Sequence, residues 1–166
     1  MPARLSPFRT DLGPKFAQHL IAASKVLAGS ALPAATRDLV NIRASQINGC
    51  GGCLDMHVKE AVRAGETPVR LSLVAAWRET TVFTDAERAA LELAEQGTRL
   101  ADGAGVTDEA WADAARHYDD EQLLALVAHI AVINAFNRLN VILQQRGGDY
   151  QPGQLGHASA PEPAAS

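Results

Sequence analysis

Hydrophobic side chains recur every three to four positions along most of the chain, which is the period of one face of an α-helix. Together with capping residues at segment starts and glycine or proline between segments, this pattern predicts seven helices. Their expected bounds are residues 14–28, 35–47, 50–64, 68–75, 85–102, 108–117 and 120–144. Because the alternating pattern of strands is almost absent, we expect an all-α fold.

The last of these helices has an unusual pattern. Apolar side chains lie almost all the way round it, so we expect it to be buried in the core or in an interface between subunits. His129 lies on the same stripe as Phe136 and Asn140. We interpret it as a core histidine with a hydrogen-bonded ring rather than as a catalytic residue.

The two ends of the chain lack helical periodicity. Residues 1–13 contain proline and are interpreted as an extended arm placed to lie on a neighbouring subunit. Residues 147–166 are rich in Gly, Pro, Ala and Ser, a composition typical of disordered tails. We therefore expect one helical domain over residues 1–146, followed by a mostly disordered tail over residues 147–166.

Composition narrows the class of protein. The chain has 166 residues, the length of one domain, and its 47% apolar but only 5% aromatic residues predict a core rich in Ala and Leu. Lys and Arg number 15 against 19 Asp and Glu, a net charge of −4, and no basic block is present. Neither nucleic acid nor a membrane is therefore an expected partner. The apolar run 20–35 contains Lys25 and Pro33, which argues against a signal peptide or a membrane span.

The two cysteines lie only three positions apart, at Cys50 and Cys53. Such a pair does not build the disulfide framework of a secreted domain, whereas in a reducing cytosol it is typical of a catalytic or metal-binding site. We expect a cytoplasmic protein. If a helix begins at Cys50, then Cys50, Cys53 and His57 fall at positions i, i+3 and i+7 and share one stripe.

This arrangement can activate a thiol. A free cysteine with a pKa of ~8.5 is about 3% ionised at neutral pH, whereas one shifted to ~6.5 is mostly ionised, roughly a twentyfold gain. The helix N-terminus favours an anion on Cys50, and His57 can accept the proton of Cys53 directly or through a water. An acidic residue would hold the imidazole in place. Asp38, twelve residues before Cys50, and Glu60, three residues after His57, both qualify.

Three other interpretations use the same residues. A zinc site could combine Cys50, Cys53, His57 and Asp38, although structural zinc usually takes a second ligand pair from elsewhere in the chain. A thioredoxin-like motif would require a βαβ context, which the flanking segments lack. Haem attachment would require a histidine where Leu54 stands, and two idle buried thiols are the remaining alternative.

The segment 37–50, continued by Cys53, Leu54, Asp55, Met56 and His57, resembles the AhpD-like branch of the carboxymuconolactone decarboxylase family. That branch carries a Cys-x-x-Cys-x-x-x-His motif with an acidic residue twelve positions before the first cysteine. The segment 133–140, Ile-Asn-Ala-Phe-Asn-Arg-Leu-Asn, is also similar to the family. The resemblance implies an all-helical fold of about seven helices and a homo-oligomer, a trimer or hexamer.

The resemblance also implies a function. A member of this branch would be a thiol peroxidase in which Cys53 attacks a hydroperoxide, Cys50 resolves the sulfenic acid as a disulfide, and His57 with Asp38 relays the proton. It would need no metal or prosthetic group, and an external dithiol, a lipoyl domain or a thioredoxin-like donor, would reduce it. We prefer Asp38 over Glu60 on this ground.

The chain departs from the family at two places. The family usually has glutamate where this chain has the shorter Asp38, which we expect to reach His57 through water. The family usually has larger, often aromatic, residues where this chain has Gly51 and Gly52, which we expect to ease closure of the disulfide. Two further functions stay open: a redox sensor that forms the disulfide without turnover, and lactone decarboxylase chemistry that leaves both cysteines dispensable.

Overall fold

The computed structural model describes residues 3–103 and 105–154, and within these residues the fold contains helices and no strand. The all-α prediction with seven helices is confirmed, with two short 3-10 helices in addition. In chain order the elements are η1 (Pro7–Arg9), α1 (Leu12–Ala28), α2 (Ala34–Ile47), α3 (Gly51–Arg63), α4 (Pro68–Leu73), η2 (Val74–Glu79), α5 (Asp85–Thr98), α6 (Asp108–Ala115) and α7 (Asp120–Ile142).

Side-chain caps begin most of these helices where the sequence predicts them. Thr84 and Asp119 form complete capping boxes at the starts of α5 and α7. Thr67 and Thr107 each accept one backbone N–H at the starts of α4 and α6. The C-terminal ends of two helices differ from the prediction. Helix α5 ends at Thr98 and α7 at Ile142, before the expected residues 102 and 144.

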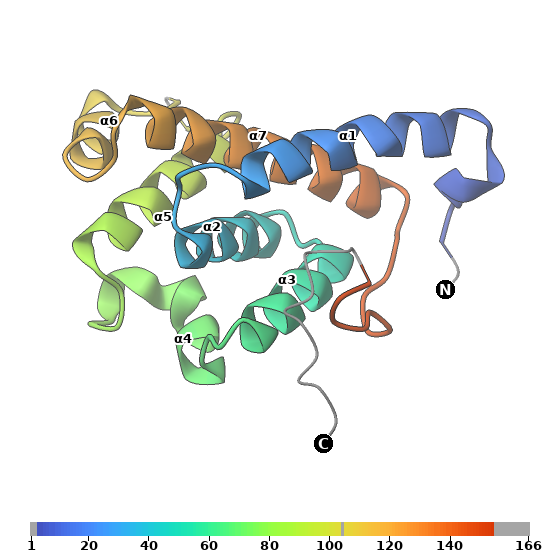
Figure 1. Ribbon diagram of the computed structural model, residues 1–166, viewed down its shortest axis with the longest axis horizontal. Helices are drawn as coiled ribbons and strands as arrows, with labels where there is room; N and C mark the ends of the chain where they lie inside the picture. Colours follow the sequence, from blue (N-terminus) through green and yellow to red (C-terminus); the bar gives the residue numbers. More distant parts are fainter. Residues whose placement is uncertain (1–2, 104, 155–166) are drawn as a thin grey trace, which may run out of the picture.

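Helix α2 lies at the centre of the molecule and packs against α3, α5 and α7 (Figure 1). Its apolar side chains Leu39, Val40 and Ile42 are fully buried. Leu91 of α5 and Leu126 of α7 are equally buried. Because α2 has neighbours on several sides, its C-terminal end is held firmly, and the chain that leaves it enters α3.

Helix α7 runs beside α1, in the opposite direction, across one side of the molecule (Figure 1). It also packs on α2 and α5, so the prediction of a buried last helix holds on that face. On the other face Leu124 and Ile142 stay 66% and 62% exposed. By length and composition alone, α7 could cross a membrane. In this structure it packs on α1, α2 and α5, as a core helix does.

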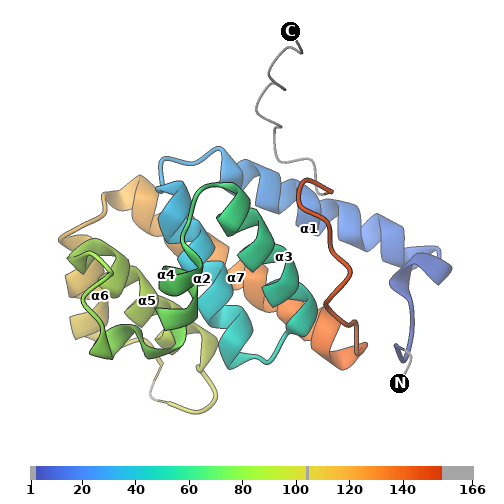
Figure 2. The same cartoon turned by 90° about the horizontal axis from the view of Figure 1, so that it is seen from below.

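Both ends of the described chain are tied to the region where α7 ends. The backbone N–H of Arg4 donates to the carbonyl of Leu143 at 3.0 Å. After α7 the chain turns and runs along α3 (Figure 2). Residues 147–154, part of the segment expected to be disordered, lie against α3, where the N–H groups of Gly148 and Tyr150 donate to Asp55. Residues 155–166 lie outside the described part.

Candidate dithiol site

The turn between α2 and α3 positions the cysteines. Gly49 has a φ of +65°, a left-handed conformation that glycine adopts without strain. Cys50 follows in an extended conformation as the N-cap of α3, so the helix proper begins at Gly51, one residue later than predicted. The sulfur of Cys50 accepts the backbone N–H of Cys53 at 3.4 Å. It therefore lies at the positive end of the helix, as expected for the first cysteine.

The two sulfurs are joined as a disulfide, with Cα atoms 5.4 Å apart. This Cα distance is typical of bridged cysteines. Cys50 and Cys53 are only 1% and 2% exposed, and they pack with Ala44, Ile133 and Phe136. The sequence prediction that the pair can act as a dithiol/disulfide couple agrees with this geometry.

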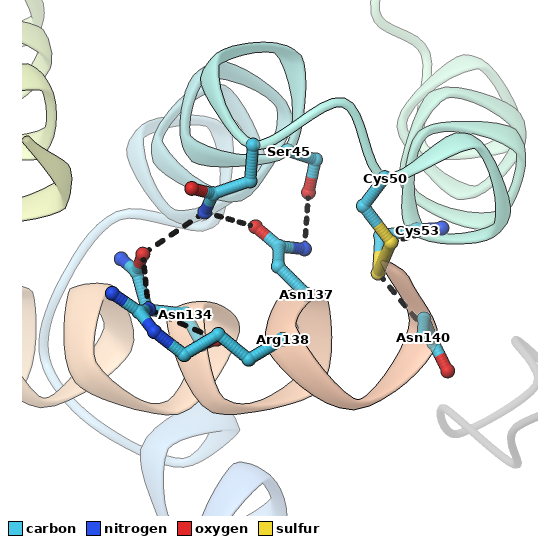
Figure 3. Close-up of a disulfide and its surroundings, with 8 residues drawn as sticks. Ser45, Cys50, Cys53, Asn134, Asn137, Arg138 and Asn140 are labelled. Atoms are coloured by element: carbon cyan, nitrogen blue, oxygen red, sulfur yellow. Dashed lines mark hydrogen bonds between the residues drawn. A yellow bond between two sulfur atoms is a disulfide. The ribbon is translucent and has the colours of Figure 1, made fainter. Parts of the chain in front are cut away.

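Helix α7 brings an amide to the disulfide. The Nδ2 atom of Asn140 lies 3.3 Å from the sulfur of Cys53 and donates to it (Figure 3). In the sequence Asn140 falls on the predicted last helix, and the cysteine motif gives it no role. Cys53 and Asn140 are 87 residues apart, so only the packing of α7 on α3 brings them together.

Further amides join α7 to the end of α2. Asn48 donates to the Oδ1 atoms of Asn134 and Asn137, each at 2.9 Å, and Asn137 donates to Ser45 at 3.0 Å (Figure 3). Asn137 is fully buried. In the sequence Asn134, Asn137 and Asn140 fall at i, i+3 and i+6 of a mostly apolar helix. This spacing places the three amides along one side of α7, and it could have indicated their shared role.

His57 and Asp38 lie on neighbouring helices. His57 is half-buried on α3, one turn beyond Cys53, and Asp38 is half-buried on α2, which packs on α3. Both side chains take part in interactions. The proposed relay from Cys53 through His57 to Asp38 stays a prediction.

Glu60, the alternative partner of His57, binds the C-terminal segment. Its Oε1 atom accepts from the hydroxyl of Tyr150 and from the N–H of Gly153. Lys59, next to it, pairs with Asp55 one turn earlier at 2.6 Å. The outer face of α3 therefore holds residues 148–153, although their composition predicts a disordered tail.

Residues 146 and 147, which precede this segment, pass close to the two glycines between the cysteines. A Cβ atom at Gly52 would lie 3.6 Å from the carbonyl oxygen of Arg146, and one at Gly51 would lie 3.9 Å from the nitrogen of Gly147. Both are ordinary contacts, so alanine fits, but a large side chain directed there would meet the segment. At Gly147 even a Cβ would overlap the carbonyl of Gly51. Glycine is thus required at 147 for the two backbones to approach.

Two other predictions concern histidine and metal. His129 is 8% exposed, and its Nε2 lies 3.3 Å from the carbonyl of Leu27, as expected for a core histidine. Burial lowers the pKa of its imidazole, which keeps the ring neutral. Among residues 3–103 and 105–154, no group of three or more His, Cys, Asp or Glu side chains is placed to hold a metal ion. With both cysteines joined in the disulfide, the ligand set of the zinc interpretation is not assembled in this structure.

This fold and motif define a class of protein. The model of the carboxymuconolactone decarboxylase family matches residues 14–96, and the chain belongs to this family. The predicted resemblance is therefore confirmed. The chain is also 37% identical over 136 residues to the uncharacterized protein YdfG of Bacillus subtilis (strain 168), a match that covers 82% of this chain and 92% of YdfG.

Solved structures share the fold. A protein of unknown function from Agrobacterium tumefaciens, ATU0492, described as a candidate AhpD antioxidant defence protein, matches with a TM-score of 0.83 and 30% identity. The match covers 90% of this chain and 100% of that one. The debrominase Bmp8 matches with a TM-score of 0.74 and 21% identity over 82% of this chain and 73% of Bmp8, a likeness of fold alone. The AhpD-like fold is thus shown.

Proposed function

We propose that this protein is a thiol-dependent hydroperoxidase that works through the Cys50–Cys53 couple. The observation that carries the proposal is the buried Cys-x-x-Cys disulfide at the N-terminus of α3. The similarity to ATU0492, described as a candidate antioxidant defence protein, supports it. An enzyme of this kind needs a nucleophilic sulfur and a second sulfur within bridging distance, and this geometry supplies both.

The reaction balances without a cofactor. The Cys53 thiolate attacks the distal oxygen of a hydroperoxide, the O–O bond breaks, and the alcohol leaves after taking a proton. The Cys50 thiol then attacks the sulfenic acid of Cys53, which releases water and forms the disulfide. An external dithiol reopens the bond by exchange and is itself oxidised. In this scheme His57, oriented by Asp38, accepts the proton of Cys53 before the attack.

The burial of the sulfurs favours a second candidate. Because Cys50 and Cys53 are at most 2% exposed, peroxide and reductant enter only after a local opening. A slow opening would make the protein a redox sensor or dithiol oxidoreductase, which forms the disulfide once and does not turn over. The two candidates share the chemistry and differ in the rate of re-reduction.

Peroxide consumption by the reduced protein separates them. With cumene hydroperoxide and excess dithiothreitol, we expect continuous consumption and, without dithiothreitol, loss of two thiols per chain. Cys53→Ser should abolish consumption, because no attacking sulfur is left. Cys50→Ser should react once and leave a sulfenic acid that dimedone traps. Consumption at full rate by Cys53→Ser would overturn the proposal, and a single stoichiometric burst would favour the sensor.

The remaining predictions concern location and partners. We keep as proposals a cytoplasmic location, a protein dithiol as reductant, and assembly into a homo-oligomer. Helix α1 supports the proposed assembly into a homo-oligomer, because it contains no buried residue in the isolated chain. Its side chains Leu12 and Val26 are 73% and 76% exposed, and Phe8 just before it is 76% exposed.

A further inference from the structure

We infer that Asn140 is a catalytic residue: its side-chain amide stabilises the sulfur of Cys53 as a thiolate and thereby makes Cys53, rather than Cys50, the attacking sulfur. The inference rests on the proposed function in taking Cys53 as the nucleophile. It assigns a role to a residue on α7, outside the Cys-x-x-Cys-x-x-x-His motif.

The contact has the geometry of a hydrogen bond to sulfur. The Nδ2 atom of Asn140 lies 3.3 Å from the sulfur of Cys53 and is the donor. The cysteine is 2% exposed, so bulk water does not solvate a charge that forms on its sulfur. A hydrogen bond to a charged group contributes more than one between neutral groups, since the donor replaces lost solvation. Asn140 is therefore placed to support the thiolate more than the thiol.

The position of Asn140 is fixed by its own helix. One turn earlier on α7, Asn137 is fully buried and bonded to Ser45 and Asn48 at the end of α2. The chain continues from Asn48 into Cys50 through a single glycine. The amide and the sulfur are thus held on two elements that are locked together within a few residues of the contact.

The contact with Asn140 matters because the two sulfurs differ in what favours their ionisation. The sulfur of Cys50 accepts the N–H of Cys53 at the start of α3, and the dipole of the helix favours a negative charge there. On that basis alone Cys50 would be the more readily ionised sulfur. Asn140 supplies a donor at Cys53 that offsets this advantage. Removing it should shift reactivity from Cys53 toward Cys50.

Alkylation with iodoacetamide across a range of pH tests this assignment without any peroxide. In a Cys50→Ser background only Cys53 reacts, and in a Cys53→Ser background only Cys50 does. The pH midpoint of the alkylation rate reports ionisation, whereas the plateau at high pH reports access to the buried sulfur. A merely structural role of Asn140 would change the plateau and leave the midpoint in place.

We expect Asn140→Leu to move the midpoint of Cys53 upward by about one pH unit, the effect of losing one hydrogen bond to a charged group. At a pH well below both midpoints the rate should then fall about tenfold. Asn140→Asp, which has nearly the same size but a negative charge, should move the midpoint further. In Asn140→Leu the midpoint of Cys50 should not change. Gln145→Leu is the matched control, because this exposed amide donates to the carbonyl of Leu5 and not to a cysteine.

Two outcomes would overturn the assignment: an unchanged Cys53 midpoint in Asn140→Leu, or equal shifts at both cysteines. If Asn140→Leu does not fold, Asn140→Asp decides in the same way, and circular dichroism melting identifies folded variants. The expected midpoint shift together with no consumption of cumene hydroperoxide would keep the role of Asn140 and reject the proposed peroxidase.

Discussion

Buried polar side chains gather in two places in this molecule, and they are satisfied by different means. One is the amide cluster of Asn48, Asn134 and Asn137 beside the disulfide, where the asparagines bond mainly to one another and to neutral groups, and Arg138 also donates to Asn134. The other is the carboxylate cluster of Glu87 and Glu95 on α5, where arginines neutralise buried charge. The two clusters therefore differ both in the charge they carry and in their distance from the disulfide.

In the carboxylate cluster each acid has several donors. Glu95 accepts from Arg43 at 2.6 Å, from Trp77 at 2.9 Å and from Arg78 at 2.7 Å. Burial raises the pKa of the Glu95 carboxyl, but these hydrogen bonds outweigh it and bring the pKa below the ordinary value of 4.5. The charge is therefore permanent near neutral pH, and its role is structural.

None of the three asparagines of the amide cluster carries a charge, and the cluster contains no acid, although Arg138 donates to Asn134. Cys53 lies beside it, in contact with Asn140, so a thiolate formed there does not compete with an acid already in the amide cluster. Breaking the carboxylate cluster should therefore cost stability without altering the sulfur. Breaking the amide cluster should affect the α2–α7 junction and, through Asn140, the reactivity of Cys53.

The largest effect should come from Glu95→Ala. Removing one partner of a buried ion pair leaves Arg43 uncompensated, and we expect a loss of about 3 kcal/mol in the free energy of unfolding. The melting temperature should fall by roughly 6–12 °C. Urea unfolding and a thermal melt measure both, and the alkylation midpoint of Cys53 should stay in place. Glu92→Ala is the matched control, since Glu92 pairs with Arg78 on the exposed side and should cost under about 1 kcal/mol.

Asn137→Ala should have the next largest effect. This fully buried amide bonds Ser45 and Asn48, and its removal leaves both with an unpaired group, which we expect to cost about 2 kcal/mol. Urea unfolding measures the loss, with Gln145→Ala as an exposed amide control. If the two variants were equally stable, the amide cluster would not be what holds α7 on α2.

Acid should produce a smaller change, to which the carboxylate cluster contributes. For Glu87, as for Glu95, burial raises the pKa, but hydrogen bonds, here from Arg70 and Thr84, lower it below 4.5. A lowered pKa in the folded state means that the stabilisation is present above pH 4.5 and is lost as the pH falls through the folded value. Urea midpoints between pH 3 and 7 should therefore decline on the acid side. Glu95→Gln should decline less, and a slope equal to that of the unmodified protein would contradict this origin.

Helix starts and the cysteine motif depend on neighbours in the chain. The capping boxes at Thr84 and Asp119 join residues three apart, so their hydrogen bonds are decided by local sequence. The spacing of Cys50 and Cys53 likewise brings the sulfurs together within one helical turn. These features could be predicted because local backbone geometry is the same in any fold that contains the helix.

The contacts that complete the site depend on packing instead. Asn140 and Cys53 are 87 residues apart, and Gly148 and Asp55 are 93 apart. No local rule brings such residues together, because their meeting requires α7 and the segment after it to pack on α3. The sequence by itself determined the helices, their caps and the cysteine pair. Only the tertiary structure decided which amide reaches the sulfur and why glycine is required at position 147, since both answers depend on where distant backbone segments come to lie.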